Sequence, residues 1–140
     1  MMSDSQRFPV AAHALAYLAH KNADCAGAAV SSGELAASIA TNPVVVRRVT
    51  AMLARAGLIA TRPGACGGAW LLKPAREIGL DAVLRAVNGG AHFGAPPPGS
   101  KDCPVGQRLP SVVKAAISAA DDAAAHQLSR TTVADLLAAD

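Results

Sequence analysis

Apolar side chains recur at intervals of three and four residues in five stretches of the chain, the spacing that places them along one face of a helix. These stretches cover residues 6–21, 32–40, 43–56, 77–87 and 109–128. A shorter apolar group at 133–137 follows a polar cap region at 129–132. The pattern therefore predicts five helices and a short closing helix, in a chain that is mainly α.

Local capping signals mark the limits of the second and third of these helices. The serine pair at 31–32 precedes Glu34, an order in which a serine caps the helix and the glutamate reaches back to form a capping box. Asn42 followed by Pro43 is the sharper signal, because asparagine caps a helix and proline at the first helical position sacrifices no needed hydrogen bond. Gly57 ends that helix. The pair of helices predicts a helix-turn-helix unit.

Two short apolar segments without helical spacing follow this unit. Leu58–Thr61 and Ala69–Leu72 flank the glycine-rich stretch 62–68, an arrangement typical of a two-stranded hairpin whose tip forms a wing. The fold class expected from these elements is mainly α with a small β-hairpin. The elements predict a winged helix-turn-helix head followed by one long C-terminal helix.

The long helix expected at 109–128 carries a longer apolar stripe than the head can cover. A helix of about 20 residues spans roughly 30 Å, so its apolar stripe would stay exposed unless a second copy of the chain packed on it. In the glycine- and proline-rich residues 88–106, the apolar side chains follow neither the helical nor the strand spacing, which predicts a loop. We expect a head at 1–88, a candidate sensor loop at 89–107, and a dimerisation helix with a closing helix at 108–140.

Positive charge is concentrated in the helix-turn-helix and the hairpin. The formal net charge is only +3, but residues 42–76 hold six basic residues and no acidic one. Arg47, Arg48 and Arg55 share one face of the third helix at 100° per residue. The packed face, about a third of a turn away, is expected to comprise Val45, Val49, Met52, Leu53 and Ala56. A basic helix of this kind fits the major groove of B-DNA, so the sequence predicts double-stranded DNA as the partner.

The contacts with DNA are expected from the helix between Pro43 and Ala56 and from the wing between Arg62 and Gly68. Arginines pair with phosphates or with guanine acceptors, and Arg62 is expected to contact phosphate or the minor groove rather than to read bases. The wing glycines predict a tight turn and close approach of the backbone to DNA. The candidate DNA-binding residues are Ser32, Thr41, Asn42, Pro43, Arg47, Arg48, Thr50, Arg55, Arg62, Gly67 and Gly68.

Other classes of function lack support in the sequence. No apolar run reaches the roughly 18 residues of a membrane span, and the N-terminus lacks the order of a secretory signal, so we expect a cytoplasmic protein without a membrane partner. The glycines at 64 and 67–68 lack the lysine-serine ending of a phosphate loop. The four histidines accompany no nucleophile at triad spacing, so we expect no enzyme.

Four segments carry a resemblance to a known family. The series PVAAHALAYLA, ELAASIATNPVVVRRVTAMLARAGLI, RPGACGGAWLLKPAREIGLDAVLRAVNG and CPVG, in this order and at these separations, resembles the Rrf-two (Rrf2) family of bacterial winged-helix regulators over nearly the whole chain. The resemblance implies a dimer held by the long C-terminal helix, with one head on each half-site. It also implies that NPVVVRR belongs to the recognition helix and GACGG to the wing.

The loop before the long helix departs from the family pattern. Cluster-binding members carry three cysteines there, whereas this chain has only Cys103, so we expect no cofactor and no metal ligands. A mixed-ligand iron-sulfur cluster that uses His92, His13 and a neighbouring subunit is the alternative that the loop leaves open. Cys103 and Cys66 are candidate thiol sensors, although a free cysteine in a wing is more often incidental.

The sequence predicts a dimeric DNA-binding regulator whose heads contact half-sites about 34 Å apart in a palindromic operator. Repression rather than activation is implied by the family alone. One alternative is a winged-helix module that binds protein or a small ligand and has no affinity for DNA. Another is a redox or iron-sulfur sensor with unusual ligands. No motif in the sequence identifies the effector.

Overall fold

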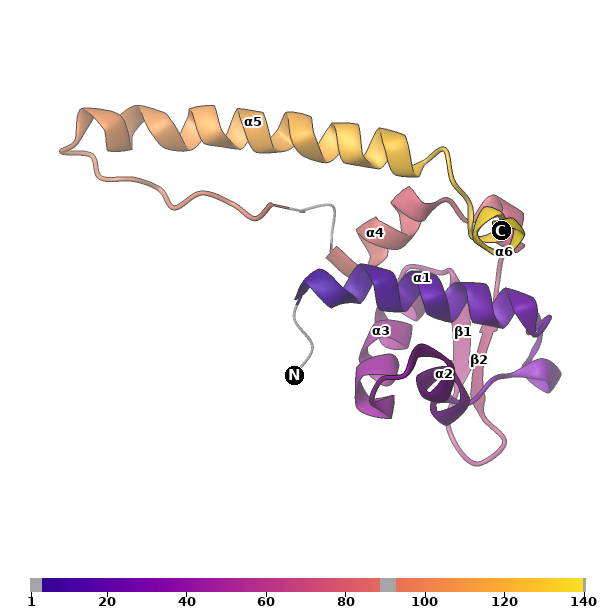
Figure 1. The fold of residues 1–140 in the computed structure, drawn as a ribbon. Helices are drawn as coiled ribbons and strands as arrows, with labels where there is room; N and C mark the ends of the chain where they lie inside the picture. Colours follow the sequence, from indigo (N-terminus) through magenta and orange to yellow (C-terminus); the bar gives the residue numbers. More distant parts are fainter. Residues whose placement is uncertain (1–3, 89–92, 140) are drawn as a thin grey trace.

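The computed structural model describes residues 4–88 and 93–139, and it shows the expected mainly α fold with a small hairpin (Figure 1). The head contains α1, α2, α3, the two hairpin strands and α4, and α5 and α6 follow it. The helices and strands are α1 (Asp4–His20), α2 (Ser32–Ile39), α3 (Pro43–Arg55), β1 (Ile59–Arg62), β2 (Gly68–Leu71), α4 (Leu80–Asn88), α5 (Pro104–Leu128) and α6 (Val133–Ala138), with 3₁₀ turns at Ala26–Ala28 and Ala75–Glu77. The predicted winged helix-turn-helix architecture is confirmed.

The core of the head lies where α1, α3 and α4 meet. Leu15 and Leu18 of α1, Leu53 of α3 and Val83 of α4 are fully buried there. Burial of an aliphatic side chain of this size stabilises a fold by about 1.5–3 kcal/mol relative to exposure. The apolar stripes of these helices therefore hold the helix-turn-helix in place, and the surface on the far side of α3 is left free.

The hairpin is tied to the start of α2 by a third, single-residue strand position. β1 and β2 pair antiparallel, with Arg62 opposite Gly68. Val30, between α1 and α2, exchanges two backbone hydrogen bonds with Ala69, at 2.9 and 2.8 Å. A Cβ on Gly68, where φ is +149°, would lie 2.3 Å from the carbonyl oxygen of Val30. Only glycine admits this close approach, so the glycine serves the sheet.

The helix starts agree with the predicted capping residues, with one difference. The Oδ1 of Asn42 accepts a hydrogen bond from the Val44 N–H at 2.8 Å, and Ser31 Oγ accepts one from the Glu34 N–H at 3.1 Å. The Glu34 carboxylate does not reach back in a capping box, because it accepts a hydrogen bond from the Tyr17 hydroxyl at 2.7 Å instead. The Tyr17 hydroxyl of α1 thus replaces the local backbone N–H as the donor to the Glu34 carboxylate.

Replacement of Ser31 by alanine is expected to lower the free energy of unfolding by about 1 kcal/mol, because one N–H of the first turn of α2 loses its acceptor. Ser32→Ala is the matched control, since Ser31 and not Ser32 is the cap. Urea unfolding followed by circular dichroism, with all variants at one protein concentration, measures the difference. Equal stabilities of the two variants would contradict this assignment of the cap.

Two boundaries in the C-terminal half differ from the sequence prediction. α4 begins at Leu80 rather than at residue 77, because the preceding residues form a 3₁₀ turn and the Leu80 N–H donates to the Thr131 carbonyl at 2.9 Å. α5 begins at Pro104 rather than at Leu109, so the loop predicted at 88–106 overlaps α4 by one residue and α5 by three, and its residues 89–92 lie outside the described residues. Proline at the first position of a helix is compatible with the helix, although the glycines and prolines around it hide the helical period.

The chain returns to the head after α5. Figure 1 shows α5 extending away from the head, with α6 lying beside α1. Val133 of α6 is fully buried in the core of the head, and its N–H donates to the Ile78 carbonyl at 2.9 Å. The closing helix thus packs with the head of the same chain. The predicted division at residues 88 and 107 stays a prediction.

The long helix itself has no buried residue in the described structure. Its apolar stripe leaves Leu109 half exposed, and Val105 and Val112 are 61% and 59% exposed. Exposed aliphatic side chains in one row are typical of a surface that another chain covers.

Candidate nucleic-acid interface

The exposed face of α3 carries the three predicted arginines. Arg47, Arg48 and Arg55 are all exposed, and no acidic residue lies between Asn42 and Arg76. An arginine-rich helix face of this kind can pair with phosphates and with guanine edges. The predicted basic face of the helix is therefore available to a partner.

The packed face of α3 is rotated relative to the prediction. Val46 and Thr50 are buried together with the expected Val49 and Leu53, whereas Ala56 is exposed. The difference arises because α1, α2, α4 and β1 all pack against α3, so several neighbours decide which of its residues are buried. A helical wheel alone does not show which neighbour will pack there.

Thr50 was expected to offer a polar contact to DNA, and its environment argues against that role. It is only 7% exposed, and its hydroxyl donates to the Arg47 carbonyl at 3.1 Å. A threonine whose hydroxyl bonds back to the preceding turn is satisfied within the helix. Thr50 therefore serves as part of the wall between α3 and the wing.

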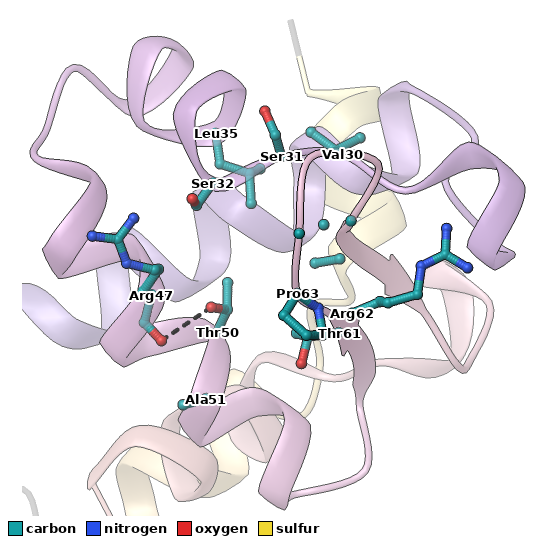
Figure 2. A pocket seen from close by; sticks show the side chains of 14 residues that line it. Val30, Ser31, Ser32, Leu35, Arg47, Thr50, Ala51, Thr61, Arg62 and Pro63 are labelled. Atoms are coloured by element: carbon teal, nitrogen blue, oxygen red, sulfur yellow. Dashed lines mark hydrogen bonds between the residues drawn. The ribbon is translucent and has the colours of Figure 1, made fainter.

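A groove of about 500 Å³ separates α3 from the wing. Figure 2 shows Ser32 at one end of it, Arg47 and Thr50 on the α3 side, and Pro63 on the wing side. Ala69, Val30 and Leu35 are buried residues that also line it. Arg62 of the wing lines it as well, so the groove combines hydroxyl groups and two arginines with an apolar floor.

Internal contacts hold the wing in shape. The Nη2 of Arg62 donates to the Cys66 carbonyl at 3.1 Å, across the turn, and the Gly67 N–H donates to the Gly64 carbonyl at 3.0 Å. A Cβ on Gly67 would lie 2.0 Å from the Arg62 carbonyl oxygen. Gly67 and Gly68 are thus required by the hairpin and by Val30, which explains these glycines without any approach to DNA.

The remaining predicted contact residues lie around the turn before α3. Asn42 and Pro43 are exposed but serve first as the cap and the first residue of α3. Thr41 and Ser32 are partly buried. Val44, which the prediction did not include, is 47% exposed and lies one helical turn before Arg48. Its apolar character concealed it, although the same helical wheel that grouped the arginines places it among them.

A polar seam joins α1 to α2 beside this surface. Besides Tyr17, the Glu34 carboxylate contacts the Lys21 Nζ at 3.7 Å, and the His13 Nε2 lies 3.0 Å from the Ser38 Oγ. The hydrogen bond to Glu34 raises the pKa of the Tyr17 hydroxyl, because it stabilises the protonated phenol, and the negative charge of Glu34 adds to this effect. The seam positions α2, and with it the turn into α3.

The thiols do not form a ligand set within one chain. Cys25, Cys66 and Cys103 are exposed and belong to different places in the fold, namely the turn before α2, the wing and the start of α5. Across residues 4–88 and 93–139, no three histidine, cysteine or acidic side chains gather as metal ligands would. His92 lies outside the described residues. The donors of the described chain do not fit an iron-sulfur cluster, which normally needs four ligands.

Among the described helices, none is both long enough and apolar enough to cross a membrane. The 25-residue α5 carries charged residues along its length. Its exposed apolar stripe is therefore one face of an amphipathic helix.

Comparisons with known proteins agree with this geometry. The model of the Rrf2 family, described as an iron-dependent transcriptional regulator, matches residues 4–139. The chain is 32% identical over 108 residues to YwnA of Bacillus subtilis (strain 168), a candidate HTH-type transcriptional regulator, with 76% of this chain and 80% of YwnA covered. Relatives of this kind regulate transcription and are not enzymes, in agreement with the sequence prediction.

Solved structures show the same fold. A candidate DNA-binding protein is 30% identical and superposes with a TM-score of 0.71, covering 94% of this chain and 98% of its own. CymR (YrzC), the global cysteine regulator of Bacillus subtilis, is 21% identical with a TM-score of 0.66, and both chains are covered completely. The described elements are thus those of a known class of regulator.

Proposed function

Because the chain belongs to the Rrf2 family of DNA-binding transcriptional regulators, we propose that it acts as a homodimeric repressor that reads a palindromic operator. The observation that carries the proposal is the exposed face of α3, where three arginines lie beside a structured wing. An α-helix fits the major groove, and a hairpin next to it can reach the adjacent minor groove or backbone.

The dimer is supported by α5. Its apolar stripe runs along a helix that has no buried residue, and Leu109 and Val112 are among its most exposed members. An isologous contact between two such helices would cover both stripes and set two heads side by side. Two heads about one turn of DNA apart would match the half-sites of a palindrome. Bound over a promoter, in the cytoplasm, such a dimer represses by excluding polymerase.

We further propose that the regulator works without an iron-sulfur cluster, since the described donors do not gather. The role of Cys103 and Cys66 as thiol sensors stays a prediction. Cys103 is exposed immediately before α5, and Cys66 lies in the wing. Anaerobically purified protein is expected to show no visible absorbance and no bound iron. Absorbance that accompanies stoichiometric iron would overturn this part of the proposal.

Selection from a pool of random DNA duplexes tests the regulator. The wild-type chain is expected to enrich a palindrome of two half-sites separated by about one helical turn, and affinity for it is expected to fall steeply with salt, because phosphate contacts release counterions. No enrichment at low salt, by reduced and oxidised protein alike, would instead favour a winged-helix module that binds another protein or a small ligand.

A further inference from the structure

A second groove lies between α5 and the extended segment that leads to it. Figure 1 shows this segment running out beside α5 to the far end of that helix, and we call its residues 93–99 the strap. The groove has a volume of about 450 Å³, and its lining includes Phe93, Pro96 and Pro97 of the strap and Leu109, Val113 and Ile117 of α5. None of the residues that line it has a charged or hydrogen-bonding side chain. The side chains that bound the groove are therefore hydrocarbon throughout.

α5 carries two neighbouring apolar stripes, and one of them faces the strap. Pro110, Val113 and Ile117 lie within about 60° of one another at 100° per residue, and all three are partly buried. Val112 is 59% exposed, lies about 100° from Val113 and is outside the lining. A dimer contact centred on Val112 thus leaves the stripe under the strap for another occupant.

The strap is held close to α5 where the helix begins. Gly99 and Gly106 lie so near each other that a Cβ on Gly99 would overlap the Gly106 carbonyl, an approach that only glycine admits. Proline has a fixed φ and no backbone N–H, so Pro96 and Pro97 form a stiff wall without a hydrogen-bond donor. The groove is thus formed before any ligand enters it.

We propose that this groove binds a small, uncharged and largely hydrocarbon molecule. Its volume lies within the range of small-molecule sites in proteins. A lining without charges favours an uncharged ligand, because a charged group would leave water without gaining a partner. A helix of about 10 Å diameter occupies roughly 420 Å³ per turn, so the groove is too small for the long helix of a second copy.

The position of the groove also suits an effector site. The strap belongs to the segment that connects the head to α5, the helix of the proposed dimer. A ligand that contacts both the strap and α5 therefore couples these two parts of the chain. This effector role rests on the proposed function, whereas the binding of the ligand does not.

Phenylnaphthylamine, an uncharged probe whose fluorescence rises in apolar surroundings, tests the site without DNA. The wild-type chain is expected to bind it saturably, with one probe per chain. Anilinonaphthalene sulfonate has the same rings and a sulfonate group, and it is expected to bind at least about tenfold more weakly, because its charge must leave water. Equal or tighter binding of the sulfonate, or no saturable binding of either probe, would overturn the proposal.

Val113→Asn places an amide in the lining and is expected to weaken the binding of phenylnaphthylamine by about tenfold, since the probe would strip water from a polar group. Ser118→Asn is the matched control, because Ser118 is exposed and lies outside the lining. It is expected to bind the probe as the wild type does. Thermal melting of each variant verifies its fold. If Val113→Asn loses no more affinity than Ser118→Asn, the probe binds elsewhere and the proposal fails.

Val112→Glu distinguishes a ligand site from a contact between two copies. The variant is expected to bind phenylnaphthylamine as the wild type does, because Val112 does not line the groove. Probe binding by Val112→Glu but not by the wild type would show that a second copy fills the groove, and it would overturn the assignment to a small molecule.

Titration of the selected palindrome in the presence of phenylnaphthylamine tests the effector role. At the lowest concentration that saturates the wild type, the probe is expected to change its affinity for the palindrome by about fivefold or more, and to affect Val113→Asn far less. Unchanged affinity of the wild type would reject the effector role and leave the ligand site standing. A chain that binds no duplex would contradict the proposed function, while the fluorescence titration still decides the ligand site.

Discussion

Val112→Glu is expected to leave the chain monomeric and to weaken its binding to the palindromic operator by about 100-fold or more, because two linked heads bind far more tightly than one. Val112 is 59% exposed on α5 and lies outside the lining of the groove between α5 and residues 93–99. A charge there interferes with a second copy without disturbing the packing of its own protomer. Sedimentation equilibrium and titration of a full and a half operator measure the two effects.

Ser118→Glu is the matched control on the same helix. Ser118 is exposed and lies on the opposite side of α5 from the apolar stripe at 100° per residue. This variant is expected to stay dimeric and to bind the operator as the wild type does. A Val112→Glu protein that remains dimeric, or a monomer that retains full affinity for the palindrome, would show that α5 does not join the two heads.

Gly68→Ala is expected to lower the free energy of unfolding by about 3 kcal/mol or more, since a strained φ and a steric overlap add together. The new Cβ would lie 2.3 Å from the Val30 carbonyl oxygen, at a residue with φ of +149°. Relief of the overlap must separate the wing from the strand before α2. The melting temperature is expected to fall by about 10 °C, and DNA affinity is expected to fall with it, because the wing moves relative to α3.

Gly64→Ala separates the cost of the strained backbone φ from the cost of the steric overlap. Gly64 also has a positive φ, of +99°, but a Cβ there meets nothing within 4 Å. Its expected cost is about 1–2 kcal/mol from the backbone alone. Differential scanning calorimetry at one protein concentration compares the two variants. Equal melting temperatures would mean that the contact between Gly68 and Val30 contributes nothing to the stability of the head.

Local interactions explain why the helix-turn-helix could be predicted from the sequence. Asn42 caps α3 through an N–H two residues away, Pro43 fixes its own φ, and Gly57 adopts a φ of +78° directly after the helix. These preferences act within one turn of chain. They hold whatever packs nearby, so the limits of α3 follow from the neighbouring residues alone.

The start of α5 could not be predicted from the neighbouring residues. Pro104 and Gly106 interrupt the apolar period, so the first turn of the helix resembled the loop before it. Helix propensity is a weak prior that packing overrides. The short sequence CPVG supported the family resemblance, but nothing in its immediate neighbours indicated that it was helical.

The burial and exposure of the side chains at the candidate site depend more strongly on residues that are distant in the sequence. The arginines of α3 were grouped correctly because the helical period sets their relative angles. The burial of Thr50 and the exposure of Val44 depend on which side of α3 faces the start of α2 and the hairpin. That side is decided by Val30 and Ala69, whose hydrogen bonds join segments about 40 residues apart in the sequence.

The sequence by itself determined the order of the helices, the caps of α2 and α3, the hairpin and the basic face of α3, because each results from interactions among residues within a few positions of one another. Only the tertiary structure decided the rotation of α3, the groove beside it, the third strand position at Val30 and the return of Val133 to the core of the head. These features arise from backbone pairing and packing between distant segments, and the spacing of residues along the chain does not specify which segments meet.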